Sequence, residues 1–447
     1  MKGNLATQAV IIIWTMIVRW VVWPLTYVVR LVSDRVKEQV DARPVVRDLT
    51  ILLAAERRRF GDCVVFFCSS AGEYEQAKPV IDRLVVGGDT FCHVFFFSVS
   101  GSKFLRARKD PVSWSMSPPD DAFLWGSLFA ALRPSKTFVV RHELWPAFLW
   151  SAAQWGKVLI INAVVPSLWG RQGKWQEKIN LGIKSWLFTF ADLVCVVAQS
   201  DQDFFERWLR IPASKILISG DTKFDRVIER SRQKRLTVAD QRELFRTRWR
   251  PAGCDLLLIG GSVHLPDIEL MAGALSHKDL ARVKILLVPH DISSGNVARI
   301  FERIRQLNFS CELLSEIENA EFEFTGEHPR VIIADEMGRL SELYGVADFA
   351  WVGGAVHGKI HNVLEPSAWG LPVSSGTNFQ NSQEAVALHK AGLLFTAPDA
   401  QTLKTHWAGL LGDVAARGEN TRLFAESLAG ATTRVIDAIT NNFPNER

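Results

Sequence analysis

The stretch CVVFFCSSAGEYEQAKP (residues 63–79) shows the unit from which this chain is built. An apolar run is followed by a turn of small residues and then by a segment of helical composition. Strands that are hydrophobic on both faces are typical of parallel sheets covered by helices. The stretch therefore predicts a β-strand whose carboxyl end leads through a turn into an α-helix.

The same unit recurs in two series along the chain. The apolar runs of the first series lie at residues 63–68, 92–99, 137–140, 158–162, 193–199 and 216–220. Those of the second series lie at residues 255–261, 283–289, 330–334, 348–354 and 371–376. The pattern predicts an α/β fold with two doubly wound, parallel-sheet, Rossmann-like domains that face an interdomain cleft.

Changes in composition divide the chain into five parts. Residues 226–253 are highly charged and lack an apolar run, which is typical of a linker helix between domains. We therefore expect a membrane anchor at 1–40, an N-terminal domain at 41–225, a linker at 226–253, a C-terminal domain at 254–420 and a terminal helix at 421–447. Because the first strand begins near Cys63, the body is expected to fold without the anchor.

The anchor is an N-terminal apolar segment. Residues 9–29 contain a single charge, Arg19, and 21 residues are close to the roughly 20 that cross a bilayer as a helix. Arg19 at mid-span and the helix-kinking Pro24 favour a shallow helix in the membrane interface as a competing reading, and a buried core helix is a third. Basic residues after the segment favour a cytoplasmic body.

Composition excludes some classes of partner and site. The 447 residues carry 52 Lys+Arg and 48 Asp+Glu, a balance of +4 that offers no basic stripe for nucleic acid. The cysteines form no CxxC pair, which is typical of reduced, buried thiols. They are Cys63, Cys68, Cys92, Cys195, Cys254 and Cys311.

Two acids follow strands of the first series. Glu73 comes in the turn after the first strand, and Glu143 lies in HELWP, after the run at 137–140. A partly desolvated carboxylate at the carboxyl edge of a parallel sheet can take a proton from an attacking hydroxyl. The alternative for both is an ordinary first-turn helix acid, stabilised by the helix dipole.

The turns of the second series are rich in glycine and imidazole. GGSVH (residues 260–264) and the segment 348–366, DFAWVGGAVHGKIHNVLEP, each lead from a strand into a helix and offer amides to a phosphate. Glu365 could accept hydrogen bonds from ribose hydroxyls. For His357 and His361, ordinary loop polarity is the alternative. No HExxH motif or Cys/His cluster indicates a metal site.

Taken together, these stretches resemble the 3-deoxy-D-manno-octulosonic acid (Kdo) transferases, membrane-anchored GT-B glycosyltransferases of lipopolysaccharide synthesis. In the first half the matching fragments are SxGE at 70–73, HELWP at 142–146, INA at 161–163, ADLVCVVAQS at 191–200 and KFD at 223–225. In the second half they are GSVH at 261–264, DEMGRLSELYGVAD at 335–348, VGG at 352–354 and HNVLEPSAWGLPV at 361–373.

The resemblance implies a function and a set of site residues. Kdo would pass from CMP-Kdo to a lipid A precursor with inversion and without a metal cofactor, at the cytoplasmic face of the inner membrane. Glu73 takes the place of the catalytic base and Glu143 that of a second essential acid near the acceptor. The nucleotide-sugar site would comprise Ser262, His264, Gly353, Gly354, His361, Asn362 and Glu365, with Lys223 in a turn beside the hinge.

The chain departs from the family at cationic and polar positions. Ser102, Val164 and His290 stand where arginines are expected, Phe67 where a histidine is expected and Ala147 where an asparagine is usual. Lost guanidinium groups weaken recognition of carboxylates and phosphates. Two alternatives therefore stay open: a diverged GT-B enzyme with another nucleotide sugar or a less phosphorylated lipid acceptor, and a non-catalytic membrane scaffold.

Overall fold

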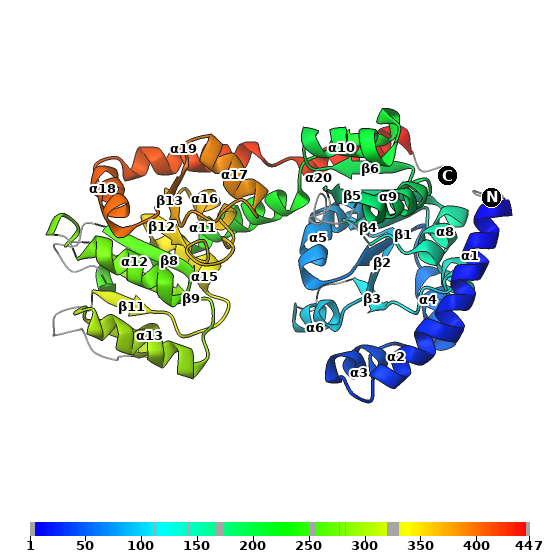
Figure 1. Cartoon of the computed structure of the whole chain (residues 1–447), viewed down its shortest axis with the longest axis horizontal. Coiled ribbons are helices and arrows are strands. Elements are labelled where there is room, and N and C mark those ends of the chain that lie inside the picture. The colour runs from blue at the N-terminus through cyan, green and yellow to red at the C-terminus, as the bar shows by residue number, and fades with distance from the viewer. Residues whose placement is uncertain are drawn as a thin grey trace. The chain divides into compact units, whose positions relative to one another are not determined.

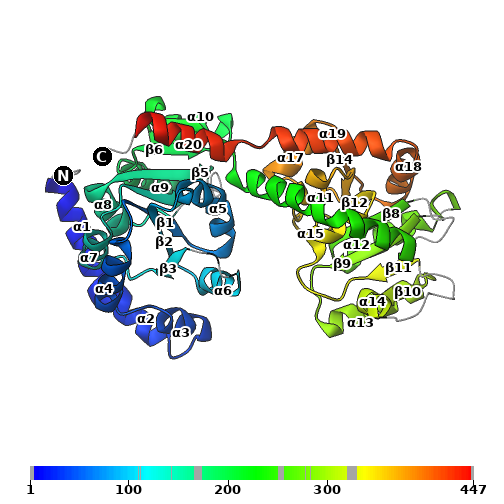
Figure 2. The same cartoon turned by 180° about the vertical axis from the view of Figure 1, so that it is seen from behind.

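The computed structural model describes residues 5–108, 110, 112–141, 143–165, 174–249, 256–276, 278–281, 283–319 and 330–443. The chain forms two compact units (Figures 1 and 2). Unit 1 comprises residues 1–226 and 429–447, and unit 2 comprises residues 227–428. Each unit contains a seven-stranded sheet in which every strand pair is parallel, so the predicted pair of α/β domains is confirmed.

The sheet of unit 1 has the strand order β3-β2-β1-β4-β5-β6-β7. Its strands are β1 Asp62–Cys68, β2 Thr90–Phe96, β3 Ser113–Met116, β4 Lys136–Val140, β5 Lys157–Ala163, β6 Leu193–Val196 and β7 Ile216–Ile218. The helices that follow the N-terminal segment in this unit are α4 Val46–Arg57, α5 Ala71–Val85, α6 Val99–Arg108, α7 Ala122–Leu132, α8 Pro146–Trp155, α9 Lys174–Phe188, α10 Gln199–Leu209 and the short η2 Ala213–Lys215.

The sheet of unit 2 has the order β10-β11-β9-β8-β12-β13-β14. Its strands are β8 Leu256–Val263, β9 Val283–Pro289, β10 Cys311–Leu313, β11 Val331–Ile333, β12 Phe349–Val352, β13 Val373–Ser375 and β14 Leu394–Thr396. Its helices are α12 Leu265–Leu275, η3 Lys278–Leu280, α13 Ser294–Gln306, α14 Leu314–Asn319, α15 Leu340–Leu343, η4 Tyr344–Val346, α16 Leu364–Trp369, α17 Gln383–Lys390, α18 Ala400–Leu410 and α19 Val414–Ser427.

Three strands that the sequence did not predict, β3, β10 and β14, are the outer strands of their sheets. An outer strand pairs on one side only, so it can be short and partly polar, as SWSM in β3 and CEL in β10 are. The central strands, by contrast, are buried along almost their whole length, which is why their apolar runs stand out. The five cysteines within the described ranges are buried and unpaired, and Cys254 lies outside those ranges.

The N-terminal segment forms a continuous helix, Leu5–Val29, composed of α1 Leu5–Ile17, a π-helical turn η1 Val18–Val22 and α2 Trp23–Val29. By length and composition it is apolar enough to cross a membrane. One face packs on unit 1, beside α7 and α8 (Figure 2), and α3 Asp34–Asp41 follows it.

Hydrogen bonds and an ion pair join this helix to the rest of unit 1. Trp14 Nε1 donates to Asp120 Oδ2 at 2.7 Å, and Arg19 Nη2 lies 2.6 Å from Asp121 Oδ2. The mid-helix charge that made a membrane span doubtful therefore has a carboxylate partner in the body.

The chain crosses between the units twice. α11 Thr222–Trp249 leads from unit 1 into unit 2, which begins at Val227 and so includes most of the segment expected as a linker at 226–253, and α20 Ala431–Asn442 lies in unit 1 again. The terminal stretch expected as one helix is two helices, α19 and α20, because Gly430 adopts φ +94° between them. Asp225 joins the two crossings, since its carboxylate accepts from Gly430 N and Thr432 N, both at 2.5 Å.

Candidate active site

Glu73 lies at the carboxyl edge of the unit 1 sheet, in the first turn of α5. Ser70 caps this helix, and Glu73 Oε2 accepts a hydrogen bond from Ser69 N at 2.5 Å. Burial raises the pKa of Glu73 to about 7, although the hydrogen bonds from Ser69 act in the opposite direction. Glu73 thus lies in the first turn of a helix, as expected for an ordinary helix-terminus acid. Its pKa is also suited to proton transfer near neutral pH.

Glu143 follows β4, which is the neighbour of β1 in the sheet. Trp145 Nε1 donates to Glu143 Oε2 at 2.9 Å, which fixes the direction of the carboxylate. Beyond burial, the charge of Glu143 raises the pKa of Glu73 and that of Arg141 lowers it, so the three groups share one electrostatic environment. The two predicted acids therefore lie at one sheet edge, while His142 lies outside the described residues.

Arg141 is held by a network that sequence reasoning missed. Its Nε donates to Gln76 Oε1 at 2.9 Å, and its Nη2 lies 3.7 Å from Asp221 Oδ2. Thr222 Oγ1 donates to Gln76 O at 2.5 Å, and the Asn162 amide exchanges hydrogen bonds with Thr222 at 2.7 and 3.1 Å. The INA motif and the turn before KFD thus support the position of Arg141.

Lys223 lies in the first turn of α11, within unit 1, and its backbone N–H donates to Asp221 Oδ1 at 2.8 Å. The other residues expected in the nucleotide-sugar site all belong to unit 2. Lys223 is therefore part of the first turn of α11 and belongs to a different unit from those residues.

Two of the positions that lack the expected arginines, Ser102 and Val164, lie in unit 1. Ser102 is buried in α6 and donates to Val99 O at 2.9 Å, while the adjacent Lys103 pairs with Glu38 at 2.5 Å. Val164 is half-buried just after β5. Arg171, a possible substitute cation, lies outside the described residues.

In unit 2, the glycine turns lie at the ends of the adjacent strands β8 and β12. A Cβ on Gly353 would come within 2.4 Å of Ser262 O, and Gly354 adopts φ +93°, so both positions require glycine. Asp267 fixes the two turns to each other: its Oδ2 accepts from His264 N at 3.0 Å and from Gly354 N at 3.1 Å. This arrangement lies where the strand order reverses, the usual place for a ligand in an open α/β sheet.

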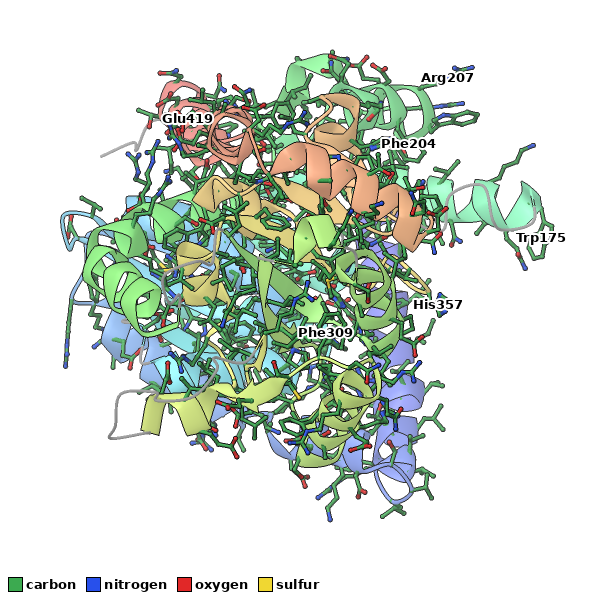
Figure 3. The ribbon with its side chains drawn as sticks, turned by 90° about the vertical axis from the view of Figure 1, so that its left-hand side faces the viewer. Trp175, Phe204, Arg207, Phe309, His357 and Glu419 are labelled. Atoms are coloured by element: carbon green, nitrogen blue, oxygen red, sulfur yellow. The ribbon has the colours of Figure 1, made fainter. Side chains whose placement is uncertain are left out.

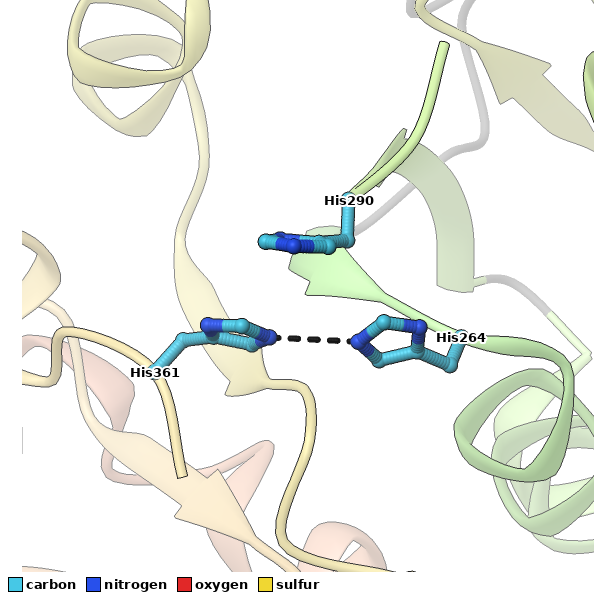
Figure 4. A group of neighbouring side chains, drawn as sticks. All are labelled: His264, His290 and His361. Atoms are coloured by element: carbon cyan, nitrogen blue, oxygen red, sulfur yellow. Dashed lines mark hydrogen bonds between the residues drawn. The ribbon is translucent and has the colours of Figure 1, made fainter. Parts of the chain in front are cut away.

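Three imidazoles meet at this edge (Figure 4). His264 follows β8, His290 follows β9 and His361 lies in the loop after β12; His264 Nε2 and His361 Nε2 are 3.2 Å apart, and the rings of His290 and His361 stack at 4.4 Å. Burial, then repulsion from His290 and His264, lowers the pKa of His361. Their ring nitrogens lie within 4.8 Å of one another, so the histidine cluster offers hydrogen-bond donors for an anion and, when neutral, ligands for a divalent metal.

The remaining predicted residues of unit 2 border this edge. Asn362 Oδ1 accepts from Leu364 N at 3.1 Å at the start of α16, and Glu365 is half-buried in the first turn of that helix. His357, labelled in Figure 3, is exposed, and its Nδ1 lies 2.9 Å from the neighbouring Val356 O. His357 thus stands outside the cluster, as loop polarity predicts.

Known proteins share both sequence and fold with this chain. A family model described as 3-deoxy-D-manno-octulosonic-acid transferase (kdotransferase) matches residues 44–226. The 3-deoxy-D-manno-octulosonic acid transferase of Haemophilus influenzae is 26% identical over 396 residues, covering 84% of this chain and 86% of that protein. The corresponding protein of Chlamydophila psittaci is 31% identical over 338 residues, 72% of this chain and 71% of its own length.

Solved structures match the fold at low sequence identity. The UDP-GlcNAc 2-epimerase of Neisseria meningitidis gives a TM-score of 0.58 at 14% identity. The match covers 85% of this chain and 100% of the epimerase chain. A glycosyltransferase of Rickettsia africae gives 0.54 at 14% identity, covering 86% of this chain and 99% of its own. Such likeness shows a shared architecture, the GT-B type, that serves several chemistries.

Proposed function

Since the chain belongs to the family of 3-deoxy-D-manno-octulosonic acid transferases, we propose that it transfers Kdo from CMP-Kdo to a lipid A precursor at the cytoplasmic face of the inner membrane. Family membership makes it a glycosyltransferase of lipopolysaccharide synthesis. The observation that carries the proposal is Glu73, a carboxylate with a pKa of about 7 that shares a sheet edge with Glu143.

In the proposed reaction, Glu73 takes the proton from an acceptor hydroxyl. The hydroxyl oxygen forms a bond to the anomeric carbon of Kdo as the bond from that carbon to the CMP phosphate breaks, which inverts the anomeric centre. CMP leaves with the electron pair, and the proton remains on Glu73. Glu143, oriented by Trp145, would hold the acceptor, and Arg141 would face its anionic groups.

Unit 2 would bind the donor. The turns at Gly353, Gly354 and Ser262 would lie beside the phosphate, and the histidine cluster would supply hydrogen-bond donors to it. Asn362 and Glu365 would bind the remainder of the nucleotide. We include independence from metal in the proposal: a chelator should leave transfer unchanged, and activity that is lost with the chelator and restored by Zn²⁺ would instead make the histidine cluster a metal centre.

The N-terminal helix would associate with the membrane by lying in its interface. Its contacts with unit 1 extend from Ile11 to Thr26, so a full span would draw the attached part of the body into the hydrocarbon region. Its opposite face is apolar and exposed; the residues there include Ile12, Ile13, Met16, Ile17, Trp20, Val21, Leu25 and Val28. Such a two-faced helix is typical of interfacial anchoring.

Mass spectrometry tests the proposal directly. Purified full-length protein is incubated with a lipid A precursor and, in separate reactions, with CMP-Kdo and several other nucleotide sugars. A product heavier by one or more Kdo residues is expected only with CMP-Kdo. Transfer from another donor alone would refute the proposed donor, and no transfer from any donor would favour the scaffold.

A second candidate follows from Ser102, Val164 and His290. With Ser102 buried and Lys103 paired to Glu38, neither residue replaces the missing guanidinium in the described structure. This favours an acceptor with fewer phosphates, or a donor without a carboxylate. Transfer rates on bis-phosphorylated and dephosphorylated acceptors decide: a clear preference for the bis-phosphorylated form with CMP-Kdo returns the chain to the ordinary family activity.

A further inference from the structure

An apolar cavity of about 250 Å³ lies inside unit 1, between the N-terminal helix and the body. Trp14, Val18, Val22 and Trp23 of the helix form one wall, and Val36 and Val40 of α3 form another. The opposite side consists of aromatic residues and prolines of the body: Phe67, Phe97, Pro118, Pro119, Trp125 and Trp145. The cavity is larger than the roughly 150 Å³ that accommodates a benzene ring, so it has room for a segment of an alkyl chain.

A guanidinium group lines this apolar cavity. Arg43 has no carboxylate partner among the described residues, and its Nε is buried without a hydrogen bond there. Its guanidinium carbon lies 4.9 Å from the ring centroid of Trp23 and 5.8 Å from that of Phe97. Stacking on rings neutralises little of the charge, so the position favours an anion from outside the chain.

A second polar atom at the cavity is also without a partner. Ser117 Oγ lines it, is buried, and has no hydrogen bond to the described residues. The carboxylate nearby gives no compensation, because Asp120 is engaged by Trp14 Nε1 and by the backbone N–H groups of Ala147 and Phe148. A buried donor and a hydroxyl without partners in an apolar wall indicate a ligand with one polar, anionic end.

The cavity adjoins the candidate active site. Phe97 stacks on Trp145 with ring centroids 5.0 Å apart, and both line the cavity. Trp145 Nε1 donates to Glu143, the acid expected near the acceptor. A molecule held in the cavity would therefore have its polar end close to the residues that handle the acceptor hydroxyl.

We propose that this cavity binds one acyl chain of the phosphorylated glycolipid acceptor, with Arg43 contacting the phosphate of its headgroup. The identity of the lipid as the acceptor rests on the proposed function, whereas binding of an alkyl phosphate does not. The two faces of the N-terminal helix then have different roles. The exposed face contacts the bilayer, and the opposite face forms one wall of the acyl site. Arg43 would supply a cation that the positions of Ser102 and Val164 lack.

Photolabelling tests binding without requiring activity. Full-length protein in phosphatidylcholine nanodiscs is irradiated with dodecyl phosphate that carries a diazirine at the chain end, and labelled residues are mapped by mass spectrometry. Labels are expected on Val18, Val40 and Trp125. Labels confined to the exposed residues Ile13 and Trp20 would overturn the proposal.

Matched variants test the contribution of the Arg43 charge to binding separately from that of the cavity volume. Arg43→Gln keeps a polar chain without the charge and should lower labelling of the cavity at least tenfold, while Arg47→Gln, at an exposed arginine four residues along the chain, should label like the wild type. Val40→Trp should fill the cavity and also abolish labelling. Full labelling of Arg43→Gln would remove the phosphate contact whether or not Val40→Trp folds.

Competition and transfer assays identify the lipid. A lipid A precursor should displace the probe at concentrations at which phosphatidic acid does not; equal displacement would make the site a general phospholipid site and overturn the acceptor assignment. Arg43→Gln should raise KM for phosphorylated acceptor about tenfold and leave KM for dephosphorylated acceptor unchanged. Labelling without any transfer would refute the proposed function alone, and transfer without labelling would refute the acyl site alone.

Discussion

At the scale of single residues, Glu73 combines a contact at a helix terminus with a pKa suited to proton transfer. Glu73→Gln keeps the hydrogen bond from Ser69 N but cannot accept a proton, so we expect transfer to fall about 100-fold or more while CMP binding persists. Glu75→Gln, two residues along α5, is the control. Undiminished turnover of Glu73→Gln would return the residue to the role of a helix-terminus acid.

The raised pKa of Glu73 also predicts how stability depends on pH. Burial raises this pKa from 4.5 to about 7, so folding favours the protonated acid. The favourable contribution is complete below pH 4.5 and is lost as the pH rises through 7. Glu73→Gln should therefore unfold like the wild type at pH 4 and be more stable by about 1 to 3 kcal/mol at pH 8, measured by denaturant titration at both values.

The histidine cluster predicts a pH dependence of nucleotide binding. Burial, then repulsion from His290 and His264, lowers the pKa of His361, and a bound phosphate would favour its protonated form. CMP should bind more tightly as the pH falls from 8 to 6, measured by calorimetry. His290→Ala should weaken binding about tenfold at pH 6 and flatten this dependence, whereas the same change at the exposed His357 should leave both unaltered; an unchanged profile in His290→Ala would exclude the cluster from the phosphate site.

At the scale of elements, the N-terminal helix is part of unit 1. Arg19→Ala leaves the carboxylate of Asp121, which is almost fully buried, without its cation, and we expect a loss of about 1 to 2 kcal/mol in the free energy of unfolding. Arg30→Ala breaks the exposed pair with Asp41 and should change it by less than about 0.5 kcal/mol. Equal effects of the two variants in micelles would show that the helix is only loosely attached.

The same contacts change an expectation drawn from the sequence. Residues 1–40 were expected to be separable from the body, yet Trp14 and Val18 form part of the cavity wall over Trp125. The apolar character of these residues is visible in the sequence. The sequence does not show whether they contact the bilayer or the protein interior, because both environments favour apolar residues. Only pairing of Trp14 and Arg19 with distant acids, a long-range contact, distinguishes them.

At the scale of the whole molecule, what could be predicted depended on whether the signal was local. Glu73 and Glu143 were proposed as site residues because each follows an apolar strand in one short motif. His290 was noted only as a missing arginine, although it follows β9, the strand beside β8. The contact of His290 with His264 and His361 depends on the strand order, which cannot be read from a single sequence. The role proposed for Arg43 depends on the N-terminal helix, whose Trp23 lies against its guanidinium group.

The carboxylate of Asp225, which bonds the backbone at Gly430 and Thr432, has a consequence for the architecture as a whole. The two segments that connect the units are joined at one residue. Unit 2 is therefore an insertion in the chain of unit 1, and the two connections to it lie side by side. Unit 2 can therefore be exchanged as one piece: replacement of residues 227–428 by another such domain would leave the two ends of unit 1 joined at Asp225. If unit 2 binds the donor as proposed, such an exchange would change donor specificity and leave unit 1 with its N-terminal helix unchanged.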